Sequence, residues 1–324
     1  MTASAADPRP LSGLTVLDFS TLLPGPLAAL MLAEAGARVI KIERPGGEDM
    51  RFHGPIVGEG ASAMSAYYAL LNRGKEVVTA DLKAKDAFER LRPLIETADV
   101  VIEQFRPGVM ERLGFGPEAL QAVNPRLVYC SISGFGASGP RASAPGHDLN
   151  YQATTGALAI GRMSKTDPQM PGTLTADIAG GTFPAVINIL LALIGRDKTG
   201  RGSRIDIAMT DAMFTFGFFS QAEGAATGRF PDPGEPIFVG SLPRYSLYGT
   251  KDERLLAVGA LEDKFWLAFC DVIDLPADLR EDHATPAETR AAVAERVAAR
   301  THAEWTEARA GTEFCVTPVL SMAE

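Results

Sequence analysis

Residues 14–43 read LTVLDFSTLLPGPLAALMLAEAGARVIKIE, and this stretch decides the fold. Its first five residues form an apolar run of strand length, and the two prolines at 24 and 26 then favour a helix entry. Gly36 is placed to end that helix, and residues 37–43 return as a second buried strand. The stretch therefore predicts a strand, a helix and a strand, the unit from which parallel sheets are built.

The same alternation continues through the first two thirds of the chain. Further strands are predicted at residues 77–81, 99–103, 127–133 and 204–208, and long helices at 83–97 and 176–196. Strands separated by helices predict an α/β fold with a mostly parallel sheet covered on both faces. Ligands of such sheets bind beyond the carboxyl ends of the strands.

The composition changes near residue 222, where glycine and proline become frequent. This change predicts a large domain over residues 1–222, a linker over 223–243 and a smaller α+β domain over 244–324. The small domain is predicted to hold a hairpin at 245–260, helices that begin near Pro286 and Thr301, and a last apolar run at 315–320.

Composition also excludes several classes of function. The net charge of −9 over 324 residues gives no basic field for nucleic acid, so an anionic ligand must be met by a few local Arg and Lys side chains. Cys130, Cys270 and Cys315 are too far apart for a zinc motif or a disulfide framework, which favours a cytoplasmic protein without a metal. The longest apolar run, 183–195, is too short for a membrane span, and residues 1–10 lack a signal-peptide pattern.

One glycine motif invites a wrong interpretation. Residues 134–139 match the dinucleotide fingerprint G-x-G-x-x-G after a predicted strand. The fingerprint requires a helix whose N-terminus takes the pyrophosphate, and here Pro140, Arg141 and Pro145 continue a loop instead. Nicotinamide dinucleotide binding is therefore not predicted.

Two short segments carry the ionisable residues that suit proton transfer. Residues 145–151 read PGHDLNY and place His147 beside Asp148 on a turn, while residues 175–181 read TADIAGG and place Asp177 at a predicted helix start. For each residue alone, a helix-capping aspartate or a hydrogen-bonded histidine is the alternative interpretation. The combination favours a catalytic site.

Taken together, these segments resemble the family III CoA-transferase (CaiB/BaiF) superfamily over nearly the whole chain. The motifs that carry the resemblance are LSGLTVLD at 11–18, PGP at 24–26, GARVIKIE at 36–43, NRGK at 72–75, FRPG at 105–108 and CVTPV at 315–319. Within the superfamily, three segments are similar to those of the α-methylacyl-CoA racemases, namely GHDLNY at 146–151, ADIAGG at 176–181 and VGALE at 258–262.

This resemblance implies an architecture that periodicity does not reveal. Relatives form dimers of two interlocked, ring-like protomers, each with a Rossmann-like large domain and a small domain. Each active site lies between the large domain of one subunit and the small domain of the other. Relatives usually continue beyond the position of Glu324 with a segment that returns to the large domain.

The resemblance also implies a reaction, the racemisation of 2-methylacyl-CoA thioesters by 1,1-proton transfer through an enolate. His147 and Asp177 would be the two bases, and Glu262 would orient the histidine. CoA belongs to the substrate, and no further cofactor is implied. The residues implied to contact CoA or the acyl group are Arg38, Asn72, Lys75, Arg106, Asp148 and Tyr151.

Two other functions compete with this one. A CoA transferase would use Asp177 as a nucleophile and would not need His147. A catalytically idle acyl-CoA-binding protein would keep the binding residues alone. The acyl group stays open among branched fatty, bile-acid-like and arylpropionyl thioesters.

Overall fold

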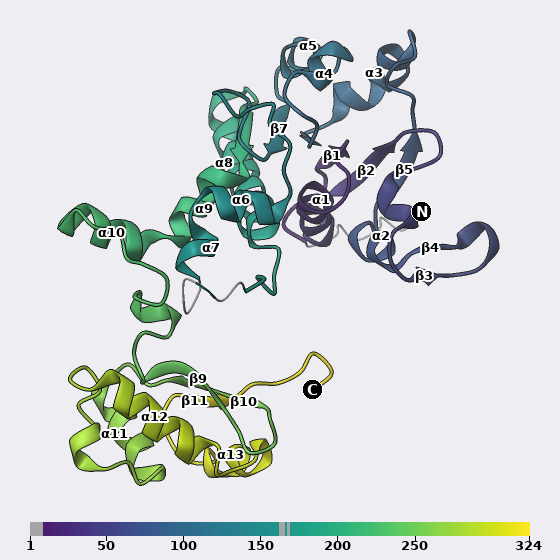
Figure 1. The fold of residues 1–324 in the computed structure, drawn as a ribbon. Helices are drawn as coiled ribbons and strands as arrows, with labels where there is room; N and C mark the ends of the chain where they lie inside the picture. Colours follow the sequence, from purple (N-terminus) through teal and green to yellow (C-terminus); the bar gives the residue numbers. More distant parts are fainter. Residues whose placement is uncertain (1–8, 162–165, 167–168) are drawn as a thin grey trace. The chain divides into compact units, whose positions relative to one another are not determined.

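The structure, a computed structural model, describes residues 9–161, 166 and 169–324. Most of the N-terminal segment for which no signal peptide was predicted lies outside these residues. The chain divides into two compact units, the first formed by the residues up to Thr155 together with Pro171–Phe216, and the second by Gly156–Met170 together with Gly217–Glu324. Figure 1 follows the chain through both.

A six-stranded sheet forms the centre of the first unit. All of its strands are parallel and stand in the order β5-β2-β1-β6-β7-β8. The predicted α/β fold with a parallel sheet is therefore confirmed. The strands are β1 (Thr15–Asp18), β2 (Arg38–Glu43), β5 (Glu76–Thr79), β6 (Val100–Glu103), β7 (Val128–Ser133) and β8 (Arg204–Ala208).

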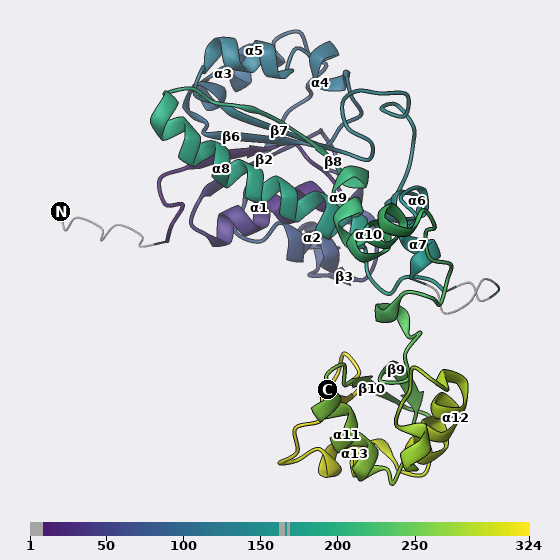
Figure 2. The ribbon, with the colours of Figure 1, turned by 90° about the vertical axis from the view of Figure 1, so that its left-hand side faces the viewer.

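Helices cover both faces of this sheet, as Figure 2 shows. On one face lie α1 (Pro24–Glu34) and α8 (Phe183–Thr199), and on the other α3 (Ala87–Thr97), α4 (Val109–Arg112) and α5 (Pro117–Val123). Leu91 and Ile95 of α3 share one buried cluster with Leu17, Ile40 and Val101 of the sheet. Shorter elements complete the unit: β3 (Ile56–Val57), β4 (Met64–Ser65), α2 (Ala66–Leu71), α6 (Asp148–Thr154) and α9 (Met209–Phe216).

The strand order creates a switch point between β1 and β6. From β1 the chain moves outward to β2 and β5 on one side, and it then crosses to β6, β7 and β8 on the other. Because β1 and β6 are parallel neighbours, their connections diverge beyond their carboxyl ends. Open α/β sheets bind their ligands in the crevice that such a divergence leaves.

The predicted helix 176–196 has an unusual first turn. Residues Ala176–Thr182 form a π-helical turn, and α8 continues directly from it. The continuous helix Ala176–Thr199 has 24 residues, so by length and composition it could cross a membrane, a test that the core helix of a soluble protein also passes. The apolar run 183–195, which was predicted to be too short for a membrane span, lies within this longer helix.

Only one side of α8 is buried in the first unit. Ala185, Ile189 and Leu193 are buried, and they recur at the helical spacing of one face. The opposite side is apolar and exposed, with Phe183, Ile187, Leu191 and Ile194 between 44% and 60% exposed.

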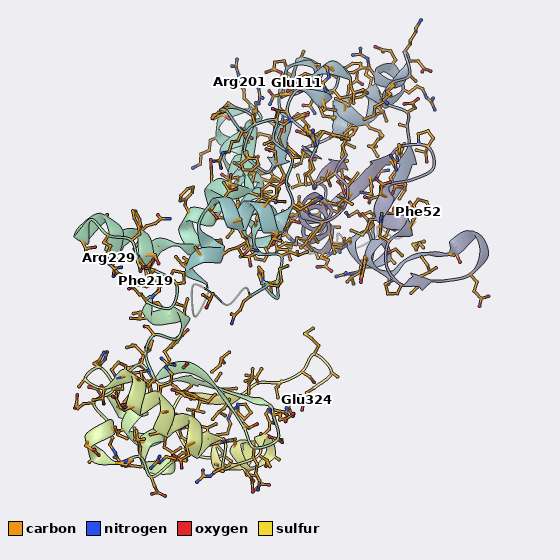
Figure 3. The ribbon with its side chains drawn as sticks, viewed as in Figure 1. Phe52, Glu111, Arg201, Phe219, Arg229 and Glu324 are labelled. Carbon is orange, nitrogen blue, oxygen red and sulfur yellow. The ribbon has the colours of Figure 1, made fainter. Side chains whose placement is uncertain are left out.

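The second unit is a small α+β structure, as predicted. Its antiparallel sheet has the order β11-β10-β9 and combines β9 (Tyr245–Gly249), β10 (Leu255–Gly259) and β11 (Val316–Pro318). Three helices, α11 (Asp263–Val272), α12 (Pro286–Val297) and α13 (His302–Ala308), pack around Trp266, Phe269 and Trp305. Glu324, labelled in Figure 3, forms an ion pair with Arg254 at 2.7 Å.

The division into units differs from the predicted domain boundaries in two places. Residues 217–243, which were predicted as the end of the large domain and the linker, lie in the second unit and contain helix α10 (Phe218–Thr227). A glycine is needed at position 224 of this helix because the Phe230 ring packs where a Cβ atom would stand. Residues 156–170, which include α7 (Ala157–Ile160), also belong to the second unit rather than the first.

Candidate active site

A cavity of about 570 Å³ opens at the carboxyl ends of β1, β6 and β7, at the switch point of the sheet. Four of the predicted site residues line it: His147, Asp177, Tyr151 and Arg106. They come from the β6–α4 loop, the start of α6 and the π-helical turn, which are far apart in sequence. The fold thus brings the predicted bases and one predicted cation to one place.

His147 precedes the first residue of α6. Its extended backbone, with φ −127°, turns the chain into the helix, and its N–H donates to Asn150 Oδ1 at 3.1 Å. Asn150 therefore fixes the turn on which the imidazole stands. The histidine is exposed in this unit, as a base that must reach a substrate has to be.

Asp148 joins α6 to the π-helical turn. Its buried carboxylate accepts the Asp177 N–H at 3.0 Å through Oδ1 and the Gln152 side-chain amide at 2.6 Å through Oδ2. It is not among the residues that line the cavity in the described part of the chain. The structure thus gives Asp148 a position behind Asp177, whereas the prediction placed it against the substrate.

Asp177 has an acidity suited to proton transfer near neutral pH. Burial, followed by the negative charge of Asp148, raises the pKa of Asp177 to about 6, and nearby His147 opposes this shift. A carboxyl group with this pKa can accept a proton and return it at little cost in free energy, because neither protonation state is strongly disfavoured near neutral pH.

Close packing holds the π-helical turn in place. A Cβ atom on Gly180 would lie 2.6 Å from the Met209 carbonyl oxygen, and one on Gly181 would lie 3.1 Å from the Met209 side chain. Thr182 Oγ1 donates to the Pro24 carbonyl at 2.8 Å. The two glycines therefore allow the turn to press against α9 and α1, which sets the position of Asp177. Short π-helical segments that continue into an α-helix are frequent at functional sites.

Gly134, the first glycine of the rejected fingerprint, and Gly146 both pack against Tyr151. A Cβ atom on Gly134 would lie 2.3 Å from the Tyr151 ring, and one on Gly146 would lie 2.6 Å from the same ring. Tyr151 also donates to the Gly146 carbonyl at 2.6 Å. Gly134 and Gly146 thus make room for the tyrosine that lines the cavity, and residues 134–145 contain no helix, as predicted.

A second cavity, of about 350 Å³, adjoins the first. It lies at the carboxyl ends of β2 and β5 and shares Thr21 and Phe105 with the larger cavity. Its basic lining residues are Arg44, directly after β2, and Lys83, shortly after β5. The sequence predictions missed both residues, although their places after two parallel strands could have indicated them.

Three of the predicted CoA contacts lie elsewhere. Arg38 is the first residue of β2, at the amino end of the sheet, and pairs with Glu76 at 2.7 Å. The Lys75 amine is buried and donates to Asp18, the Pro26 carbonyl and Asn72 at 2.8–2.9 Å. Within the described residues, neither cavity is lined by Arg38, Asn72 or Lys75.

Glu262 belongs to the second unit, where it is exposed and immediately precedes α11. Its orienting role toward His147 stays a prediction. A metal is not suggested by the described residues, since no three His, Cys, Asp or Glu side chains among them gather in one place.

Comparison with known proteins gives a consistent result. Residues 11–324 match the family model of CoA-transferase family III. The chain is 37% identical to human alpha-methylacyl-CoA racemase over 320 residues, covering 97% of this chain and 78% of that protein. It is 35% identical to acetyl-CoA:oxalate CoA-transferase of Acetobacter aceti over 337 residues, covering 100% and 84%. A crystal structure of a CaiB/BaiF family protein from Brucella suis superimposes with a TM-score of 0.85 at 30% identity, covering 97% of this chain and 85% of that one.

Proposed function

The chain belongs to CoA-transferase family III, and from this premise we propose that it racemises 2-methylacyl-CoA thioesters. The observation that carries the proposal is that His147 and Asp177 line one cavity at the switch point of the sheet. Human alpha-methylacyl-CoA racemase, which is 37% identical, supports the choice of reaction.

Racemisation needs two acid–base groups, one unprotonated and the other protonated. One base takes the proton from the α-carbon, which leaves an enolate, and the protonated partner returns a proton to the opposite face. The reaction is balanced, because one proton leaves and one arrives. Asp177, with a pKa of about 6, would act as the base for one enantiomer and as the acid for the other, and the neighbouring imidazole would take the complementary role. Nothing in these steps calls for a cofactor beyond the CoA of the substrate.

The two adjoining cavities suggest how the substrate lies. The nucleotide end of CoA, with its phosphates, would occupy the smaller cavity beside Arg44 and Lys83. The pantetheine arm would pass Thr21 and Phe105, which both cavities share, and carry the thioester into the larger cavity beside Arg106.

A CoA transfer reaction is the second candidate, and the likeness to acetyl-CoA:oxalate CoA-transferase favours it. In that reaction the Asp177 carboxylate would attack the thioester carbonyl, and the CoA thiolate would leave an acyl anhydride on the enzyme. A second carboxylic acid would then be needed to complete the transfer.

One incubation separates the two reactions. A single enantiomer of a 2-methylacyl-CoA whose α-carbon is stereogenic, such as 2-methylbutanoyl-CoA, is incubated in deuterated water without any acid acceptor. Racemisation gives both configurations with deuterium at the α-carbon. A transferase leaves the configuration unchanged, and hydroxylamine then traps an acyl group on Asp177. The second outcome would overturn the racemase proposal.

Variants of the two bases test the assignment within the same assay. His147→Ala and Asp177→Asn should each stop net racemisation. Each should still exchange the α-proton of one enantiomer, and the two variants should exchange opposite enantiomers, because each base serves one face. Exchange of the same enantiomer by both variants would contradict the two-face arrangement.

The exposed apolar side of α8 supports a homodimer. Phe183, Ile187, Leu191 and Ile194 recur along that side and are 44–60% exposed in the single chain. Contiguous apolar side chains of this kind mark interaction surfaces more often than free surface. We propose that a second copy of the chain covers them, in line with the dimers that the resemblance implies.

A further inference from the structure

The loop between β1 and α1 forms the wall between the two cavities. Thr21 lines both cavities, Leu22 lines the larger one and Ser20 lines the smaller one. A ligand that extends from one cavity into the other must therefore pass this loop.

Leu22 holds this loop in an unusual conformation. Its φ angle is +63°, in the left-handed region that side-chain-bearing residues rarely adopt. Such a conformation persists only where surrounding contacts enforce it, and it is found most often at functional sites.

The enforcing contact comes from Glu48, which lies 26 residues later in the chain. Its carboxylate accepts the Leu22 N–H at 2.8 Å through Oε2. The Glu48 residue is 3% exposed, so this hydrogen bond is shielded from water.

A buried lysine holds Glu48 in turn. Lys41 Nζ lies 3.0 Å from Glu48 Oε1 and donates to the Ser20 carbonyl at 2.8 Å. The Lys41 side chain is fully buried, and Asp18 stands 4.0 Å from the same amine. The amine thus fixes the loop at Ser20 directly and at Leu22 through Glu48.

We propose that Glu48 is a positioning residue that keeps the Thr21–Leu22 wall open for the CoA arm of the substrate. It does so by holding Leu22 in the left-handed conformation, and Lys41 orients its carboxylate. This inference rests on the proposed function only in taking CoA as the ligand that passes the wall.

The first measurement is CoA affinity by calorimetry. Glu48→Ala removes the acceptor of the Leu22 N–H and should weaken CoA binding about tenfold. Glu48→Gln retains a side-chain carbonyl that can accept this N–H and should stay within about threefold of the unaltered protein. Equal losses in both variants would overturn the proposal, since charge rather than the hydrogen bond would then matter.

A double-mutant cycle with Leu22→Gly separates positioning from general stability. Glycine adopts positive φ without steric strain, so the loop should no longer depend on Glu48. In the Leu22→Gly background, Glu48→Ala should change CoA affinity less than about threefold. A tenfold loss in both backgrounds would show that Glu48 acts through another part of the molecule.

Asp99→Asn is the matched control. Asp99 also accepts a backbone N–H, that of Thr15 at 2.8 Å, and pairs with a buried cation, Arg196, at 2.9 Å. Both Asp99 contacts involve residues at the amino end of the sheet or at the end of α8, away from the loop. This variant should leave CoA affinity within about twofold, and a tenfold loss there would contradict the inference.

Hydrogen exchange tests the loop without any ligand. In the unaltered protein the amides of residues 21–23 should exchange about tenfold more slowly than in Glu48→Ala. Their exchange rates in Glu48→Gln should be close to those in the unaltered protein. If CoA failed to bind the unaltered protein, the proposed function would fail while this measurement still decided whether Glu48 holds the loop. Equal exchange in all three proteins would overturn the inference by itself.

Discussion

Burial and the neighbouring Asp148 both oppose ionisation of Asp177, and they raise its pKa to about 6. The unfolded chain would ionise the same group near pH 3.9. Between these values the folded protein binds more protons than the unfolded chain, so its stability falls as the pH rises from about 4 to about 6. The raised pKa that the proposed proton transfer would use thus lowers the stability of the fold at neutral pH.

Asp177→Asn should therefore stabilise the protein at neutral pH. After allowance for the partial exposure of the carboxyl group, we expect the free energy of unfolding at pH 7.5 to rise by about 1–2 kcal/mol. The gain should nearly vanish at pH 4, and urea unfolding at both pH values measures it. Asp278→Asn, on the exposed surface, is the control and should change stability by less than about 0.5 kcal/mol at either pH. An equal gain for Asp177→Asn at both pH values would exclude the pKa explanation.

The cations of the two cavities allow a test of where CoA lies. Arg44→Ala and Arg106→Ala should each weaken CoA binding by about 1–3 kcal/mol, the effect of losing a charge-assisted hydrogen bond. Arg38→Ala should change the affinity little, because Arg38 is the first residue of β2, at the amino end of the sheet, and lines neither cavity. Calorimetric dissociation constants decide the point. A large loss with Arg38→Ala alone would place the phosphates at the amino end instead.

At the scale of single elements, the π-helical turn is sensitive to any side chain at Gly180. Gly180→Ala would push a methyl group against the Met209 carbonyl, 2.6 Å from the Cβ position, and should lower the free energy of unfolding by about 1–3 kcal/mol. It should also lower the exchange rate of the α-proton, because the shift moves Asp177. Gly195→Ala, within α8, has open space around its Cβ and should stabilise by up to about 1 kcal/mol. Loss of activity without loss of stability in Gly180→Ala would point to a role other than packing.

Sequence patterns predicted the elements well and their special features poorly. Apolar runs of strand length, such as residues 37–43, indicate a buried parallel strand wherever the run stands. The π-helical turn depends on the contact of Gly180 with Met209, which no local pattern contains. Residues 223–227 were predicted as linker because glycine and proline become frequent near residue 222, whereas they form the end of helix α10.

The same limit explains the site predictions. His147 and Asp177 could be identified because motifs mark them, and the fold then brings them to one cavity. Lys75 resembled a free cation, but its partner Asp18 is 57 residues away and the pairing buries it. Arg44 could have been found only by asking which residues follow the strands of a parallel sheet.

At the scale of the whole molecule, the apolar side of α8 predicts self-association. Leu191→Glu would place a charge on a side chain that is 60% exposed in the single chain and should shift a dimer toward monomer. Sedimentation velocity over a range of concentrations measures the shift. Leu267→Glu on α11, 45% exposed, should leave the association unchanged. A protein that is monomeric before any change would contradict the proposed dimer.

The burial of Lys75 and Lys41 also bears on chemical damage. Unprotonated lysine amines attack thioesters, and burial lowers the pKa of Lys75, so an accessible amine at this position would be readily acylated by an acyl-CoA. Instead the Lys75 amine gives its three hydrogens to Asp18, Asn72 and the Pro26 carbonyl, and both lysine side chains are fully covered. Arg106, the predicted cation of the larger cavity, carries a guanidinium, which does not react in this way. After long incubation with an acyl-CoA, peptide mass spectrometry should therefore find acyl groups on exposed amines such as Lys198 and Lys251, and none on Lys41 or Lys75.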